Sequence, residues 1–76
     1  MLYSIKNIHL IGIGGIGMSG IAELLKNKGF LVTGSDISDS LNVQRLTSLG
    51  IEVSIGHFKE NISDTDLVIY SDAIPK

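Results

Sequence analysis

The spacing of apolar residues along the chain predicts four strands. A nearly unbroken apolar run over Ile8–Ile13 is typical of a central parallel strand that is covered on both faces. Further strands are predicted over residues 30–35 and 67–70, and the latter is apolar throughout, so we expect Tyr70 in the core. Residues 51–55 alternate apolar and polar side chains, which indicates a strand with one wetter face at the edge of a sheet.

Between these strands the apolar period lengthens to that of a helix. Over Ile16–Lys28 the apolar residues recur at steps of three and four, and we expect Met18, Ile21 and Leu25 to form a stripe that faces the core. A shorter helix is predicted over residues 42–48, where the apolar residues again fall on one side.

The order of these elements predicts an α/β fold with a Rossmann-like parallel sheet. Because crossovers between parallel strands are right-handed, the strands are expected side by side in the order 3-2-1-4. We expect residues 1–76 to form one N-terminal domain, truncated where a doubly wound sheet normally continues. The free side of the fourth strand is then a candidate for pairing with a second copy, which would give a homodimer.

Composition narrows the classes of partner. Eight acidic and six basic residues give a net charge of −2 with no basic run, which disfavours nucleic-acid binding. The chain has no cysteine, so it has no disulfide framework and no thiolate metal site. It also lacks a signal-peptide pattern and any apolar stretch near the roughly 20 residues needed to cross a bilayer. We therefore expect a cytoplasmic protein without a membrane partner.

Four glycines within six residues mark the candidate site: Gly12, Gly14, Gly15 and Gly17. They satisfy G-x-G-x-x-G directly after a predicted strand and at the start of a predicted helix. In that context Gly12 allows a tight turn, Gly14 lets a diphosphate approach the backbone, and Gly17 lets the helix lie close to the strand. The amides of the first helical turn would face the anion. No lysine follows as in an ATP-cleaving phosphate loop.

The glycine spacing alone leaves the ligand open. Asp36 ends the second strand nineteen residues after Gly17, where such folds often meet a ribose hydroxyl, but a turn or helix-capping aspartate also fits. An NAD(P)-binding module of a dehydrogenase and a regulatory nucleotide-sensing domain are both compatible with the pattern. His9, inside the first strand, fits a packed or edge-exposed residue better than a ligand-binding one.

Longer strings of residues are more specific than the glycine spacing. Four strings closely resemble the N-terminal domain of the Mur ligases, across nearly the whole chain: IHLIGIGGIGMSGIA over residues 8–22, VTGSD over residues 32–36, Gly56-His57 and YSDAI over residues 70–74. This resemblance implies an ATP-dependent carboxylate–amine ligase of bacterial peptidoglycan biosynthesis. Within the family, the first string favours the members that join L-alanine to UDP-N-acetylmuramic acid over those that recycle murein peptides.

The resemblance also implies how UDP-N-acetylmuramic acid is bound. Its pyrophosphate would lie on residues 14–19, its uridine beside Asp36 and Ile37, and its diphosphate or sugar near His57. Asp72 stands where the family commonly has a second serine, and since a carboxylate would repel phosphate it is left out. The implied substrate-binding residues are Gly12, Gly14, Gly15, Ile16, Gly17, Met18, Ser19, Ser35, Asp36, Ile37, His57, Ser71, Ala73 and Ile74.

The remaining chemistry of the family is expected outside this chain. By resemblance, ATP, Mg²⁺ and L-alanine bind to the full-length enzyme, through a central ATP-binding domain and a C-terminal domain that are absent here. We expect no catalytic residue, no resident cofactor and no metal ligand in residues 1–76. The chain alone is therefore predicted to be inactive as a ligase.

Overall fold

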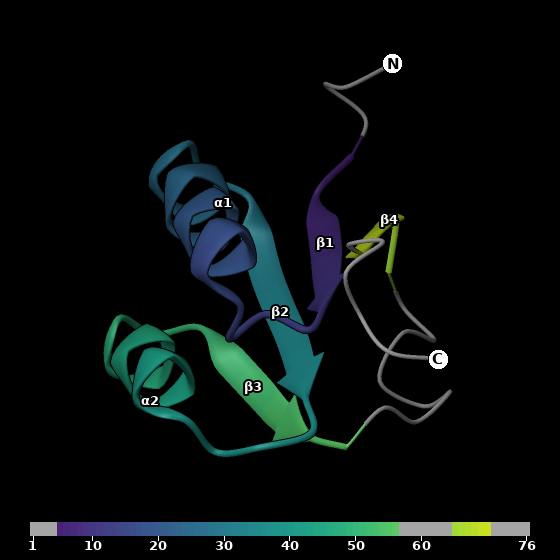
Figure 1. Ribbon diagram of the computed structural model, residues 1–76. Coiled ribbons are helices and arrows are strands. Elements are labelled where there is room, and N and C mark those ends of the chain that lie inside the picture. Colours follow the sequence, from purple (N-terminus) through teal and green to yellow (C-terminus); the bar gives the residue numbers. More distant parts are fainter. Residues whose placement is uncertain (1–4, 57–64, 71–76) are drawn as a thin grey trace.

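Four parallel strands and two helices make up the described part of the chain, residues 5–56 and 65–70 of a computed structural model (Figure 1). In chain order they are β1 (Asn7–Ile11), α1 (Ile16–Asn27), β2 (Leu31–Asp36), α2 (Leu41–Ser48), β3 (Glu52–Ile55) and β4 (Leu67–Tyr70). The strands lie side by side as β3-β2-β1-β4, and every pair is parallel. The predicted fold class and strand order are confirmed.

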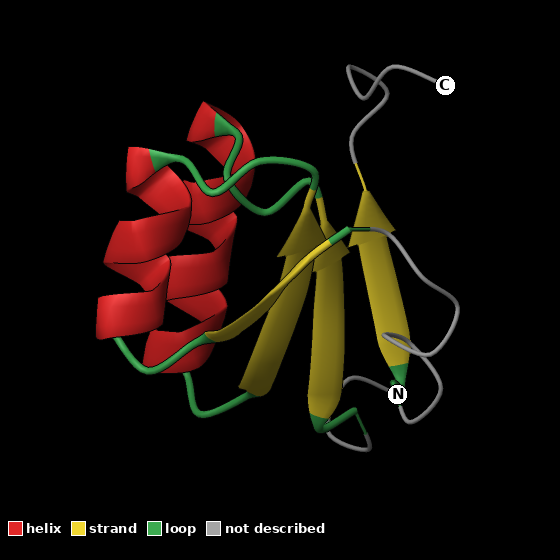
Figure 2. Cartoon of the chain, turned by 90° about the horizontal axis from the view of Figure 1, so that it is seen from below, coloured by secondary structure: helices red, strands yellow, loops and turns green. Residues whose placement is uncertain are grey.

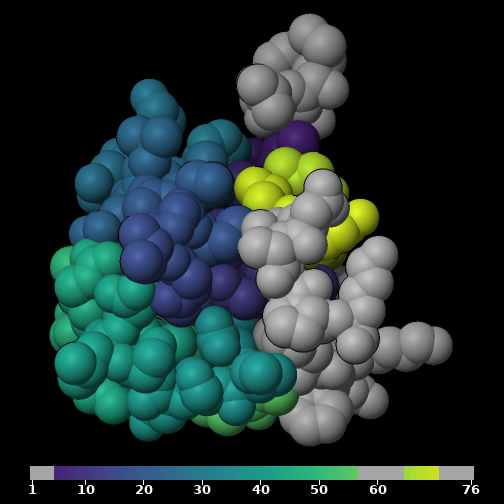
Figure 3. All heavy atoms as spheres, viewed as in Figure 1, coloured from purple at the N-terminus to yellow at the C-terminus, as the bar shows by residue number. Residues whose placement is uncertain are grey.

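Both helices lie on the same face of the sheet (Figure 2). The crossovers from β1 to β2 and from β2 to β3 run in the same direction, and right-handed crossovers then place α1 and α2 on one side. The two helices lie against each other in the space-filling view (Figure 3). Arg45 of α2 and Glu23 of α1 form an ion pair of 2.7 Å. In residues 5–56 and 65–70, neither helix has the length and apolar content to cross a membrane.

The hydrophobic core fills the layer between the sheet and the helices. α1 contributes Met18 and Ala22, and Leu25 packs against them from the next turn. The predicted stripe was wrong for Ile21, which is 40% exposed, because the buried positions follow the spacing 18, 22 and 25 instead. The other buried members of the core are Ile8, Leu10, Ile13, Val32, Leu46 and Ile51.

β1 ends at Ile11, two residues before the apolar run does. Gly12 has φ +77°, a conformation that glycine adopts without strain, and the chain turns there. Ile13 is fully buried although it lies in the turn, and it packs on Gly34 of β2 so closely that a Cβ at Gly34 would lie 2.7 Å from its own Cβ. The predicted strand was too long because burial of Ile13 comes from this contact.

β3 and β4 are the two edge strands, and they have the same pattern of burial. Tyr70 is 65% exposed, so its prediction as a core residue was wrong. Tyr70 pairs with Ile11, whereas Ile69 pairs with Leu10 of the core, so side-chain alternation places Tyr70 on the face of the sheet opposite the helices.

Asp66 ties the start of β4 to the start of β1. One of its carboxylate oxygens accepts hydrogen bonds from the backbone amides of Lys6 at 2.9 Å and Asn7 at 3.0 Å, and its own amide donates to the Asn7 carbonyl at 2.9 Å. The two bonds to the carboxylate hold the pKa of Asp66 below its ordinary value. Because the folded pKa is lowered, this stabilisation is present above the unfolded pKa and is lost as the pH falls through the folded pKa.

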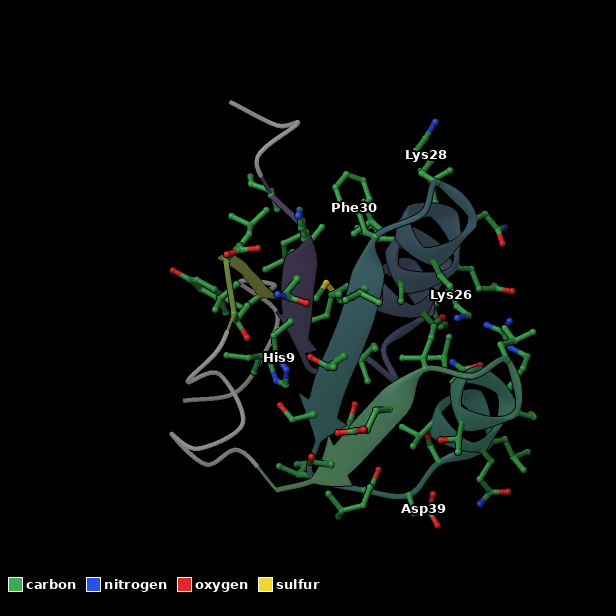
Figure 4. All side chains as sticks on the ribbon, turned by 180° about the vertical axis from the view of Figure 1, so that it is seen from behind. His9, Lys26, Lys28, Phe30 and Asp39 are labelled. Carbon is green, nitrogen blue, oxygen red and sulfur yellow. The ribbon has the colours of Figure 1, made fainter. Side chains whose placement is uncertain are left out.

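We predict that Asp66→Asn lowers the urea midpoint of unfolding at pH 7, because asparagine keeps an acceptor oxygen but loses the charge. The difference from the wild type should shrink as the pH falls below about 3.9, the unfolded value for aspartate. Asp39→Asn is the matched control, since Asp39 is exposed on the loop after β2 and its side chain points away from the sheet (Figure 4). Equal midpoints for the two variants at pH 7 would contradict the prediction.

Candidate functional site

The glycine-rich turn lies at the carboxyl edge of the sheet, next to the point where the strand order reverses. β1 pairs with β2 on one side and with β4 on the other, and all strands point the same way. Open α/β sheets bind ligands in the crevice outside this edge, at such a reversal. The turn from β1 into α1 is therefore where a ligand of this fold is expected.

The last two residues of β2 bind three consecutive amides of the turn. The Ser35 carbonyl accepts from the amides of Gly12 at 2.8 Å and Ile13 at 3.1 Å. The Asp36 carboxylate then accepts from the amide of Gly14 at 2.8 Å. The structure thus gives Asp36 a role within the protein: it fixes the path of the glycine-rich turn.

The Gly14 peptide is also held from the side of α2. Its carbonyl accepts from the Asn42 side-chain amide at 3.0 Å. A Cβ at Gly14 would lie 2.8 Å from both the Asp36 carboxylate and a methyl group of Val43. It would also lie 3.0 Å from the Ser40 hydroxyl. Gly14 is therefore required by the approach of α2 to the turn, before any ligand is considered.

The N-terminus of α1 lacks the side-chain cap that α2 has, and we call it open for that reason. At α2, the Ser40 hydroxyl accepts a hydrogen bond from the backbone amide of Val43, in the first turn, at 3.2 Å. At α1 the cap residue is Gly15, no side chain caps the helix, and the first turn has no acidic residue. The amides of Ile16, Gly17 and Met18 have no acceptor within the helix, and Ile16 is 90% exposed. This end of α1 is suited to bind an anion.

Gly17 faces open space. No atom of the described chain lies within 4 Å of the position that its Cβ would take. Close packing of the helix on the strand, the reason that the motif suggests for this glycine, is not found here. The open position instead leaves room beside the amides of the first turn.

The remaining candidate residues divide into three groups. Met18 and Ser19 are buried, and the Ser19 hydroxyl, in a side chain that is 3% exposed, donates to the Ile16 carbonyl at 3.0 Å. Ser35 is buried as well, whereas Ile37 is exposed just beyond β2. His57, Ser71, Ala73 and Ile74 lie outside the described residues.

Two residues near the turn were missed from the sequence. Asn42 was read only as the start of a helix, and His9 was expected to be packed or edge-exposed, without a partner being assigned. His9 is buried, and its ring nitrogens lie 2.8 Å from the Thr33 hydroxyl and 3.3 Å from the Ser35 hydroxyl. Serine at position 40 is a recognisable helix-cap signal, but nothing in the sequence shows that α2 begins against Gly14. In the described ranges, no group of histidine and acidic side chains is arranged to hold a metal ion.

Comparison with known proteins assigns the family. A sequence profile described as "Mur ligase family, catalytic domain" matches residues 7–76. A UDP-N-acetylmuramate–L-alanine ligase of Brucella anthropi is 60% identical over 76 residues, which are 100% of this chain and 16% of that protein. The corresponding ligase of a Sulfurihydrogenibium species is 53% identical over 70 residues, 92% of this chain and 15% of that protein.

Solved structures agree with this assignment. The UDP-N-acetylmuramate–alanine ligase of Thermotoga maritima superposes with a TM-score of 0.85 at 41% identity, over 93% of this chain and 16% of that one. A murein peptide ligase of Psychrobacter arcticus gives 0.78 at 31% identity, over 93% and 15%. The chain thus spans about one sixth of the length of these relatives. The matched profile covers nearly all of the sequence, and the chain belongs to the Mur ligase family.

Proposed function

We propose that this chain is the N-terminal, UDP-N-acetylmuramic acid-binding domain of an ATP-dependent UDP-N-acetylmuramate–L-alanine ligase. The observation that carries the proposal is the open N-terminus of α1, which follows a strand at the carboxyl edge and presents the amides of Ile16, Gly17 and Met18. The names of the relatives supply the substrate. The alanine-adding ligase is favoured over the murein peptide ligase because its solved structure is the more similar, by identity and by TM-score.

In this proposal the diphosphate binds at the first turn of α1, beyond the Gly14 amide that the glycine motif suggests. The amide of Gly14 already donates to Asp36, so a phosphate oxygen would have to displace a carboxylate to use it. The next amides that lack an acceptor within the helix are those of Ile16, Gly17 and Met18. Gly12, Gly14 and Gly15 shape the turn, and Ser19 would contact the diphosphate only by leaving its bond to Ile16.

The uridine is proposed to lie over the end of β2. Asp36 and the exposed side chain of Ile37 border the turn on that side, and Ile37 offers an apolar surface to a base. Ser35 contributes through its carbonyl, which holds the turn. His57, Ser71, Ala73 and Ile74 complete the proposed set of substrate-binding residues.

The isolated chain is expected to bind weakly. An exposed helix N-terminus contributes only about 0.3–1 kcal/mol to the binding of a negative charge. In the ligase, ATP, Mg²⁺ and L-alanine would bind to the central and C-terminal domains, and the muramic acid carboxylate would be activated there as an acyl phosphate. The described residues of this chain offer no fitting metal-ligand cluster. Because these steps are assigned to other domains, we propose that the chain by itself has no ligase activity. We also propose that it acts in the cytoplasm and that it can pair as a homodimer through β4, which is an edge strand of the described sheet.

We predict that UDP-N-acetylmuramic acid shifts the amide resonances of Ile16, Gly17 and Met18 in a ¹⁵N-labelled sample of the chain. The Gly14 resonance should shift less, because its amide stays bonded to Asp36. NADH is the comparison ligand and should leave these resonances unchanged. Shifts caused by NADH but not by the UDP-sugar would favour a dehydrogenase module, and shifts caused only by adenine nucleotides would favour a nucleotide sensor.

We predict opposite effects for alanine at two glycines of the motif. Gly17→Ala should leave the urea midpoint near that of the wild type and weaken binding of UDP-N-acetylmuramic acid, because its methyl group enters the space beside the open amides. Gly14→Ala should destabilise the fold by roughly 1–3 kcal/mol, because its Cβ overlaps Asp36 and Val43. Gly20→Ala, also on open space in α1, is the control and should change neither property for the worse. Unchanged affinity in Gly17→Ala would argue against a diphosphate at this turn.

A further inference from the structure

His9 places an imidazole ring, with two polar nitrogens, in the middle of the buried strand β1. It is 1% exposed, and the residues on either side of it, Ile8 and Leu10, belong to the core beneath the helices. Because side chains alternate along a strand, His9 projects from the opposite face of the sheet; Figure 4 labels its side chain near the end of β1. A buried imidazole is costly unless its nitrogens are hydrogen-bonded, so its partners indicate what it is for.

The two ring nitrogens bond to residues with different roles. Nδ1 lies 2.8 Å from the hydroxyl of Thr33, in the middle of β2, and Thr33 is not bonded to the glycine-rich turn in the described structure. Nε2 lies 3.3 Å from the hydroxyl of Ser35. Ser35 is the residue whose carbonyl binds the amides of Gly12 and Ile13. The ring therefore connects β1 to the one residue of β2 that holds the first half of the turn.

We propose that His9 is a positioning residue for the diphosphate-binding turn and acts through Nε2 and Ser35. The proposal rests on the proposed function of the turn and extends it to a residue that touches no ligand. A hydrogen bond to the Ser35 hydroxyl ties the side chain of Ser35 to β1 and so restrains the backbone of Ser35, whose carbonyl binds the amides of Gly12 and Ile13. That carbonyl sets where Gly12 and Ile13 lie, and the open amides of α1 follow within a few residues.

The competing explanation is that His9 only fills space between β1 and β2. Two substitutions distinguish these explanations, because each variant keeps a polar group near the position of only one ring nitrogen. His9→Asn places an amide near the position of Nδ1 and keeps a partner for Thr33, whereas His9→Gln reaches the position of Nε2 and keeps a partner for Ser35. Both remove the imidazole. A purely packing role predicts similar effects from the two variants.

The hydroxyl side offers a second, matched pair that leaves the ring in place. Ser35→Ala removes the hydroxyl that lies 3.3 Å from Nε2, and Thr33→Val removes the hydroxyl that lies 2.8 Å from Nδ1 with almost no change of shape. If both His9 variants fail to fold, this pair decides the question by itself. The positioning role predicts that Ser35→Ala resembles His9→Asn, and that Thr33→Val resembles His9→Gln.

The experiment measures amide hydrogen exchange at Gly12 and Ile13 in the ligand-free 76-residue chain, relative to the amides of β1. We expect faster exchange in His9→Asn and Ser35→Ala, and wild-type exchange in His9→Gln and Thr33→Val. In titrations with UDP-N-acetylmuramic acid, the first two variants should bind about twofold to tenfold more weakly, the factor for loss of one hydrogen bond.

Each result decides one of the two claims. Equal exchange in the two members of both pairs would overturn the positioning role and leave His9 as a packing residue. Altered exchange with unaltered affinity would also overturn it, since the turn would then move without consequence for the ligand. If the wild-type chain does not bind the UDP-sugar at all, the proposed function fails. The exchange data still decide whether His9 sets the turn.

Discussion

The bonds from the end of β2 to the glycine-rich turn are the constraint on which the rest of the site depends. The Ser35 carbonyl and the Asp36 carboxylate bind the amides of Gly12, Ile13 and Gly14 in succession. Three amides of the turn are thereby satisfied by the protein itself, and the chain leaves the turn in the direction of α1. The same bonds carry Ile13 onto Gly34, where its side chain completes the core. The same contacts thus contribute to both the core and the candidate site.

The two helix N-termini differ in their contacts: that of α2 is bonded within the fold, and that of α1 is not capped by a side chain. α2 begins against the Gly14 peptide, is capped by Ser40 and contacts the turn through Asn42, so its end is used within the fold. α1 begins at Ile16, with Gly15 as its cap residue and no side-chain cap, so the amides of its first turn have no acceptor within the helix. A carboxylate of the protein thus occupies the position beside the Gly14 amide. In the proposed function, the diphosphate would therefore bind at the start of α1 instead.

The sequence predicted the features that depend on local spacing. The strand order followed from the alternation of strands and helices with the rule of right-handed crossovers, and the turn followed from four glycines between a strand and a helix. The features that it did not predict depend on which distant segments meet. Asp36 bonds to Gly14 across 22 residues of chain, and the burial of Ile13 comes from contact with Gly34. Tyr70 is exposed on the face of the sheet opposite the helices, and this follows from the register of β4 against β1 rather than from the sequence of β4.

The central claim is that Asp36 holds the inner anion position and directs the diphosphate to the open end of α1. A crystal structure of the chain with UDP-N-acetylmuramic acid tests it most directly. The account predicts diphosphate oxygens at about 3 Å from the amides of Ile16, Gly17 and Met18, with the Asp36 carboxylate still bonded to the amide of Gly14. A diphosphate bound to the Gly14 amide with Asp36 displaced, or a UDP-sugar bound away from this turn, would contradict it.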